Sequence, residues 1–210
     1  MRSVAAFDPR PMTISCPNVL LEPLQLRHSE DLFSAGEDEE IWRYLPAEPF
    51  VTLTDATSWI RKALQEQDEG RRLPFAIMDV ASGRTIGSTS YLDINRKHRT
   101  LEIGWTWLTG AFQRTRVNTQ CKRALLGHAF ETLGAIRVQF KTDSRNLRSQ
   151  RAIERIGGVR EGTLRQTLIL PCGYVRDTVC YSIIDQEWPA VRKRLDELAS
   201  MAPKGSDVDS

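Results

Sequence analysis

The chain has 210 residues, the usual size of one domain with short terminal extensions. Its 29 Lys and Arg residues against 27 Asp and Glu give a net charge of +2, which disfavours binding to nucleic acid. Hydrophobic residues at 40% and charged residues at 27% are typical of a globular domain and exclude a disordered chain.

The cysteines and histidines are scattered, with no C-x-x-C pair and no histidine cluster, so no metal site is indicated. The first residues contain no apolar segment of the signal-peptide type. No segment approaches the roughly 20 apolar residues that cross a bilayer. We therefore expect a cytoplasmic protein with free thiols that binds neither nucleic acid nor membrane.

The terminal segments differ in composition from the rest of the chain. We expect residues 1–17 to be an N-terminal extension and residues 200–210, which are small and polar, to be a flexible tail. The chain between them shows no internal repeat and no low-complexity linker. Residues 18–199 are therefore predicted to form a single domain.

The first half of the domain alternates strands and helices. Residues 19–24 are predicted to form a strand, and Ser29 is a candidate N-cap for a helix beginning at Glu30. Apolar residues at three- and four-residue spacing predict a second helix over about 55–69. An antiparallel hairpin, 73–80 and 84–92, follows.

The next strand, Thr100–Leu108, has a regular alternation. Successive side chains of a strand point to opposite faces, so the pattern predicts two sets of residues. One face should carry Leu101, Ile103, Trp105 and Trp107, and the other Glu102, Gly104, Thr106 and Leu108.

A loop over 109–115 leads into the second half. The expected elements are a helix from Val117 to Gly134, a strand at 136–141, a helix at 148–156, strands at 163–170 and 176–184, and a last helix after Asp185. A right-handed crossover around the first of these helices would make the strands 100–108 and 136–141 parallel within an otherwise antiparallel sheet.

Several short motifs occur in a fixed order: Phe75-Ala76-Ile77 with Gly83 and Ile86-Gly87, then Leu101–Trp105, Gln113-Arg114-Thr115 and Asn146-Leu147-Arg148-Ser149. With these motifs the chain, from about Leu20 to Trp188, resembles the GNAT superfamily and is most similar to its RimJ/RimL-like branch. The resemblance implies an α+β (mixed α/β) fold, with a central, mostly antiparallel sheet flanked by helices. It also implies an acyl-CoA-dependent N-acetyltransferase.

In that family the sheet splits between its fourth and fifth strands, here 100–108 and 136–141, and admits the pantetheine arm of CoA. The backbone at the end of the fourth strand pairs with the arm, and the next loop holds the pyrophosphate at a helix N-terminus. The resemblance thus implies that the cofactor-binding residues are Trp107, Leu108, Gln113, Arg114, Thr115, Arg116, Val117, Asn118, Thr119, Asn146 and Arg151. Arg151 has the alternative role of keeping its helix hydrated.

The pyrophosphate loop departs from the family pattern Q/R-x-x-G-x-G/A. Arg116 and Asn118 replace both glycines, which in such loops allow close backbone approach and positive φ. The Arg116 guanidinium could supply charge to the same phosphate. The alternative is that Arg116 points into solvent and CoA binding is lost.

The resemblance also implies catalytic residues. A glutamate on the fourth strand, here Glu102, is often the general base, with a structural salt bridge as the alternative. The tyrosine that many members use as the acid is absent from the helix after the fifth strand. Ser149 lies where the RimJ/RimL-like branch has a serine near the thiol, and its alternative role is a helix N-cap, as for Asn146.

The acceptor site in this family lies near Trp42, Tyr44 and Trp59, which are otherwise expected as buried aromatic residues. The function predicted is transfer of an acetyl group from acetyl-CoA to a primary amine, either a protein N-terminus or a small molecule, by direct attack in a ternary complex. The alternative is a GNAT-fold module that binds CoA or regulates, with weak or no catalysis. The partners are acetyl-CoA and an amine, and we expect a monomer or homodimer without a metal.

Overall fold

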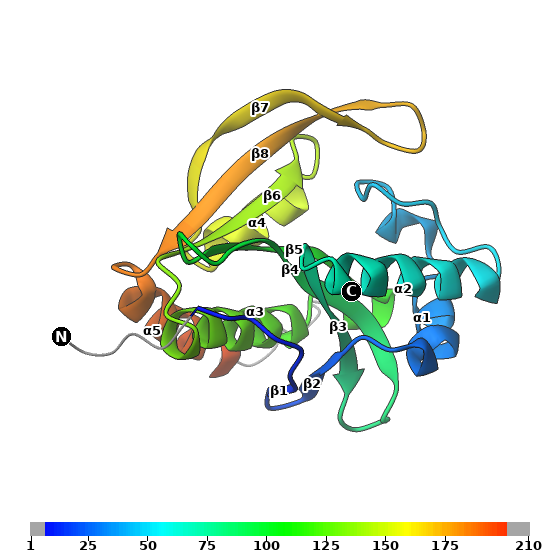
Figure 1. The fold of residues 1–210 in the computed structure, drawn as a ribbon, viewed down its shortest axis with the longest axis horizontal. Coiled ribbons are helices and arrows are strands. Elements are labelled where there is room, and N and C mark those ends of the chain that lie inside the picture. The colour runs from blue at the N-terminus through cyan, green and yellow to red at the C-terminus, as the bar shows by residue number, and fades with distance from the viewer. Residues whose placement is uncertain (1–6, 201–210) are drawn as a thin grey trace, which may run out of the picture.

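The structure is a computed structural model that describes residues 7–200 (Figure 1). Its strands are β1 Ile14–Ser15, β2 Val19–Pro23, β3 Arg72–Asp79, β4 Thr85–Asn95, β5 Thr100–Leu108, β6 Arg137–Asp143, β7 Val159–Ile169 and β8 Val175–Ile184. Its α-helices are α1 Ser29–Ala35, α2 Leu53–Asp68, α3 Val117–Gly127, α4 Leu147–Arg155 and α5 Trp188–Ser200. The predicted order of strands and helices is confirmed.

The described strands form one sheet in the order β1-β2-β3-β4-β5-β6-β8-β7. Every neighbouring pair is antiparallel except β5 and β6, which are parallel. The predicted parallel pair is therefore confirmed. After β5 the chain returns along the sheet through α3, so β6 begins at the same end as β5 and runs in the same direction.

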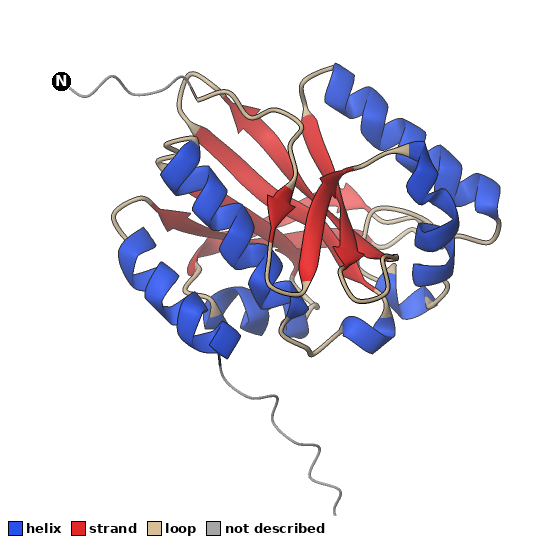
Figure 2. Cartoon of the chain, turned by 90° about the horizontal axis from the view of Figure 1, so that it is seen from below, coloured by secondary structure: helices blue, strands red, loops and turns tan. Residues whose placement is uncertain are grey.

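Helices cover both faces of the sheet, as Figure 2 shows, and each face has its own apolar cluster. The larger cluster holds the buried stripe of α3 against strand residues such as Leu101, Ile103 and Phe140. The smaller cluster packs α1 and α2 against the opposite face and contains Trp42 and Trp107. Strand β5 contributes to both clusters, so its two faces meet two different environments.

The faces of β5 differ from the prediction beyond Gly104. Ser88 of β4 lies opposite Trp107, but Ser90 lies opposite Gly104, so Trp105 and Thr106 together face one residue of β4. This is a β-bulge, and Trp105 has a positive φ of 49°. The extra residue reverses the alternation and moves Trp105 and Trp107 to the α2 face, so the predicted grouping of these residues with Leu101 was wrong.

The predicted cap of α1 was also wrong. The Ser29 hydroxyl donates to the Leu26 carbonyl oxygen, and the helix begins at Ser29 without a side-chain cap. Helix α2 does have a capping box, in which Thr52 Oγ1 accepts from the Asp55 backbone N–H and the Asp55 carboxylate accepts from the Thr52 N–H. This box starts α2 two residues earlier than expected.

The helix after β5 buries an apolar stripe at three- and four-residue spacing, formed by Val117, Cys121, Leu125, Ala129 and Leu133. The helix reaches Gly134 through a π-helical turn, His128–Thr132, and Gly134 has a positive φ of 71°.

Residues 7–17 of the expected extension pack on the domain, since Phe7 is buried and β1 pairs with β2. The rest of the expected terminal segments, residues 1–6 and 201–210, lies outside the described residues. At the other edge of the sheet, β7 and β8 form a long hairpin that arches away from the body (Figure 1).

Candidate active site

The candidate site lies where β5 and β6 separate. The two strands pair only from Thr100–Arg137 to Glu102–Gln139 and then diverge. The last six residues of β5 therefore make no backbone pairing with β6. A cavity of about 430 Å³ occupies this split. Its walls come from the ends of β5 and β6, the starts of α3 and α4, and the segment between α1 and α2.

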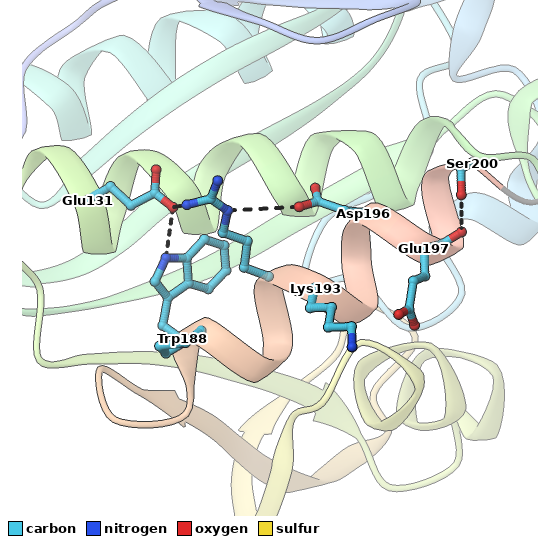
Figure 3. Close-up of a pocket in the computed structure, with 8 residues that line it drawn as sticks. Glu131, Trp188, Lys193, Asp196, Glu197 and Ser200 are labelled. Atoms are coloured by element: carbon cyan, nitrogen blue, oxygen red, sulfur yellow. Dashed lines mark hydrogen bonds and ion pairs between the residues drawn. The ribbon is translucent and has the colours of Figure 1, made fainter.

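A second hollow of about 740 Å³ lies against α5, far in sequence from the predicted site residues (Figure 3). Its polar groups bind one another: Glu131 accepts from Trp188 Nε1 at 2.9 Å and pairs with Arg192 at 3.3 Å, and Arg192 also approaches Asp196. These contacts hold α5 to the π-helical turn that follows α3. We assign the active site to the smaller cavity.

Gln113 joins the end of β5 to α4. Its Nε2 donates to the Leu108 carbonyl oxygen at 2.9 Å, and its Oε1 accepts from Arg148 at 2.7 Å. Gln113 and Leu108 line the cavity, as does Trp107. One backbone group at the end of β5 is thus bound by a side chain of the protein itself.

The loop before α3 does not need glycine where the family pattern has it. Arg116 is the N-cap of α3 with φ −73°, and Asn118 lies in the first turn of the helix. The residue of the loop whose backbone lies in the left-handed region is Arg114, with φ 60°. Neither Arg116 nor Asn118 has a positive φ, so their replacement of the family glycines causes no backbone strain of that kind.

Polar atoms at the start of α3 are available to a ligand. Within residues 7–200, Arg116 Nε and Asn118 Oδ1 are buried without a hydrogen-bond partner, and Asn118 lines the cavity. The Val117 N–H is bound by Thr115 Oγ1 at 3.2 Å, whereas Thr119 accepts from Arg155 of α4 at 3.0 Å. Thr119 thus ties two helices together, while Arg116 and Asn118 have unused donor and acceptor groups beside an anion-attracting helix end.

The start of α4 forms another part of the cavity wall. Asn146 is its N-cap, and its Oδ1 accepts from the Ser149 N–H at 3.0 Å. Ser149 is therefore not the cap, and its hydroxyl makes no hydrogen bond to any other described residue. Asn146, Ser149 and Arg151 all line the cavity.

Glu102 is a buried carboxylate, 7% exposed, beside the cavity rather than in its wall. Lys141 of β6 lies 2.8 Å from it and also binds Asp93 at 2.6 Å. Burial raises the pKa of Glu102, although the Lys141 ammonium acts in the opposite direction. A side chain at Gly104 would meet the Glu102 carboxylate at 2.7 Å, so glycine leaves the space that this carboxylate occupies.

The three predicted acceptor-site aromatics are separated. Tyr44 lines the cavity. Trp42 is buried, donates from Nε1 to the Gly36 carbonyl and packs on Trp107, with ring centroids 5.2 Å apart. Trp59 packs on Trp107 and on Trp105 of the bulge. The two tryptophans therefore support the end of β5 from behind and do not form the cavity wall.

One cavity residue that the sequence analysis missed is Arg176 of β8, which donates to the Tyr44 carbonyl oxygen at 3.3 Å. This contact joins β8 to the segment between α1 and α2. The Arg145 guanidinium lies over the rings of both Tyr44 and Tyr174. Lys122, which projects from α3, was also missed; the available signal was a lysine four residues after Asn118, on the same side of the helix.

Residues 18–159 match the acetyltransferase (GNAT) domain family. A GCN5-related N-acetyltransferase from Brucella melitensis has a similar structure, with TM-score 0.86 and 28% identity over 91% of this chain and 87% of that one. RimJ of Mycobacterium smegmatis, in complex with CoA-disulfide, shares the fold, with TM-score 0.77 and 21% identity over 89% and 94% of the two chains. The Bacillus subtilis (strain 168) protein named "Uncharacterized N-acetyltransferase YnaD" is 24% identical, covering 84% of this chain and 99% of its own.

The chain therefore belongs to the GNAT acetyltransferase family and has RimJ among its relatives of similar fold. It is an acyl-CoA-dependent N-acetyltransferase, and enzymes of this fold use acetyl-CoA. Over the described part of the chain, no group of three or more His, Cys, Asp or Glu residues is placed to hold a metal ion. None of the helices in residues 7–200 has the length and apolar character to cross a membrane.

Proposed function

We propose that this enzyme transfers an acetyl group from acetyl-CoA to a primary amine, a protein N-terminus or a small-molecule amine, by direct attack in a ternary complex. The observation that carries the proposal is the cavity in the β5–β6 split, because residues far apart in the sequence line it together. The starts of α3 and α4 form one part, and the segment around Tyr44 forms another. A donor and an acceptor can thus be held in one cavity, which direct transfer requires.

In this proposal the donor binds along the separated edge of β5, near Trp107 and Leu108, and its pyrophosphate lies at the start of α3. The unpartnered Arg116 Nε, a hydrogen-bond donor, supports this location, as do the unpaired N–H groups that every helix N-terminus carries. Gln113, Arg114 and Thr115 form the rim of this end of the cavity, and Asn146 and Arg151 face it from α4.

Glu102 acts as the general base in this proposal, directly or through a water molecule. An attacking amine must lose a proton, and a carboxylate with a raised pKa is a stronger base near neutral pH. Its position behind Gly104 and beside the cavity-lining Lys141 favours relay through water. Ser149, whose hydroxyl makes no hydrogen bond within the described residues, donates a hydrogen bond to the departing sulfur.

The test has two steps. Calorimetry with acetyl-CoA first measures donor binding, and absence of both heat and a thermal shift would reject the proposal. Release of free thiol is then followed with a panel of short peptides carrying free N-termini and of small primary amines. Binding without thiol release for any acceptor would favour a CoA-binding module over an enzyme of this substrate class.

A further inference from the structure

Lys122 is a buried lysine that the proposed mechanism does not use. It projects from α3, is only 7% exposed and lines the cavity. Its ammonium donates to Thr106 Oγ1 at 2.8 Å and lies 5.8 Å from the centre of the Phe140 ring. Thr106 is the second residue of the β5 bulge and also shares a hydrogen bond with Thr89. The bulge therefore turns a hydroxyl toward this lysine.

The positive charge of Lys122 has no counter-ion in residues 7–200. The carboxylates that face this region are Glu102 of β5, which pairs with Lys141, and Asp143 of β6, which pairs with Arg145. The neighbouring Cys121 is a thiol within the core, and Arg151, Arg155 and Arg176 on the cavity wall add only positive charge. A buried ammonium without a carboxylate partner destabilises the fold, so its presence in the cavity wall indicates a ligand that develops negative charge.

The reaction places such a charge in this cavity. When an acetyl thioester is cleaved, the sulfur leaves as a thiolate and must be stabilised or protonated. A serine hydroxyl such as Ser149 is too weak an acid to supply the proton, and α4 contains no tyrosine. Lys122 lines the same cavity from α3, as Ser149 does from α4.

We propose that the Lys122 ammonium, held by the Thr106 hydroxyl, is the acid that protonates the leaving sulfur of CoA. The inference rests on the proposed function. The amine nitrogen forms the new C–N bond with the acetyl carbon, and the C–S bond breaks with its electron pair on sulfur. The sulfur takes a proton from Lys122, the amine gives up its own proton to Glu102 or water, and solvent reprotonates Lys122.

The acidity of Lys122 suits this role. Burial lowers its pKa to about 8, while the nearby Glu102 and Cys121 act to raise it. An ordinary thiol has a pKa of about 8.5, so a proton can pass from this ammonium to a thiolate with little change in free energy. The same lysine is still largely protonated at neutral pH.

The decisive variant is Lys122→Met, which keeps the length of the side chain and removes its charge. We expect its melting temperature to rise, because an unpaired buried charge is removed, and kcat to fall about 100-fold. Wild-type kcat should decline as the pH rises above about 8, and this decline should be absent in the variant. Lys97→Met, at an exposed turn, is the matched control and should change neither quantity.

Three results would overturn the inference: an unchanged kcat, a decline at high pH that persists in Lys122→Met, or a lower melting temperature, which would make Lys122 a structural residue. A second pair, Thr106→Val against Thr106→Ser, tests it without altering the lysine, and only the valine variant should lose activity. A wild-type protein that neither binds acetyl-CoA nor releases thiol would instead refute the proposed function, so the two failures can be told apart.

Discussion

Two lysines lie on opposite sides of β5 and line the same cavity, yet their surroundings differ. Lys141 has two carboxylates within 2.8 Å, Asp93 and Glu102. Lys122 has only a hydroxyl, that of Thr106. The pKa of Lys141 is raised by its carboxylates, although burial opposes them, whereas burial lowers the pKa of Lys122 to about 8.

Strand β5 therefore separates a lysine whose charge is compensated from one whose charge is not. On the α2 face, the ion pair of Lys141 and Glu102 compensates both charges and so favours structure. On the α3 face, the uncompensated ammonium is costly to the fold and available for chemistry. The bulge at Trp105 and Thr106 produces the difference, because it turns the Thr106 hydroxyl to the α3 face.

The largest effect in this comparison is expected for Glu102→Gln, which keeps the shape of the side chain but removes the base. We predict that kcat falls about 100-fold. Because the base must be ionised, wild-type activity should fall as the pH drops through the raised pKa of Glu102, and this decline should disappear in the variant. A pH–rate profile like that of the wild type would exclude Glu102 as the base.

Asp93→Asn is the matched control for this variant. Asp93 raises the pKa of Glu102, so its removal should move the decline at low pH toward lower pH while the decline itself remains.

Lys141→Met should have the opposite effect on stability from Lys122→Met. It leaves Glu102 buried without its partner, and we expect the free energy of unfolding to fall by about 1–3 kcal/mol, measured by urea denaturation. Lys141 lowers the pKa of Glu102, so the loss of activity at low pH should move to higher pH. Equal changes in stability for the two lysine variants would contradict the conclusion that the charge of Lys141 is compensated and that of Lys122 is not.

The smallest effect is expected for Arg116→Ala, which removes the cation at the N-cap of α3. Loss of one guanidinium contact to a phosphate should weaken acetyl-CoA binding about 3- to 10-fold, measured by calorimetry. The effect should shrink at high salt, since the contact is partly exposed. Unchanged affinity would contradict the role of Arg116 in binding a phosphate. Arg114→Ala removes another arginine of the same loop, and comparing the two variants shows whether the loss of affinity is specific to position 116.

Most of the fold could be predicted because helices and strands produce patterns among residues that are close together in the sequence. The apolar stripe of α3 and the glycine that ends it follow from spacing alone, and so does the alternation of Leu101 and Ile103. The same alternation failed after Gly104, because a bulge depends on how the partner strand is paired and leaves the period of the sequence unchanged.

The candidate site was predicted in part for the same reason. Asn146, Ser149 and Tyr44 do line the cavity, whereas Trp42 and Trp59 pack behind it. Their residue types could not reveal this, because a tryptophan in the core and one in a binding site present the same side chain in the sequence. Position in the folded chain decides between the two.

The sequence by itself therefore determined the order of the elements, the parallel pair, the resemblance to the GNAT superfamily and the use of an acyl-CoA donor. Only the tertiary structure decided which charges are compensated. Lys122 and Lys141 are the same residue type in the sequence. The free energy of each charge depends on the groups that the fold places within a few ångströms of it. Those groups come from β4 and β5, whereas the lysines lie on α3 and β6, and only folding brings them together.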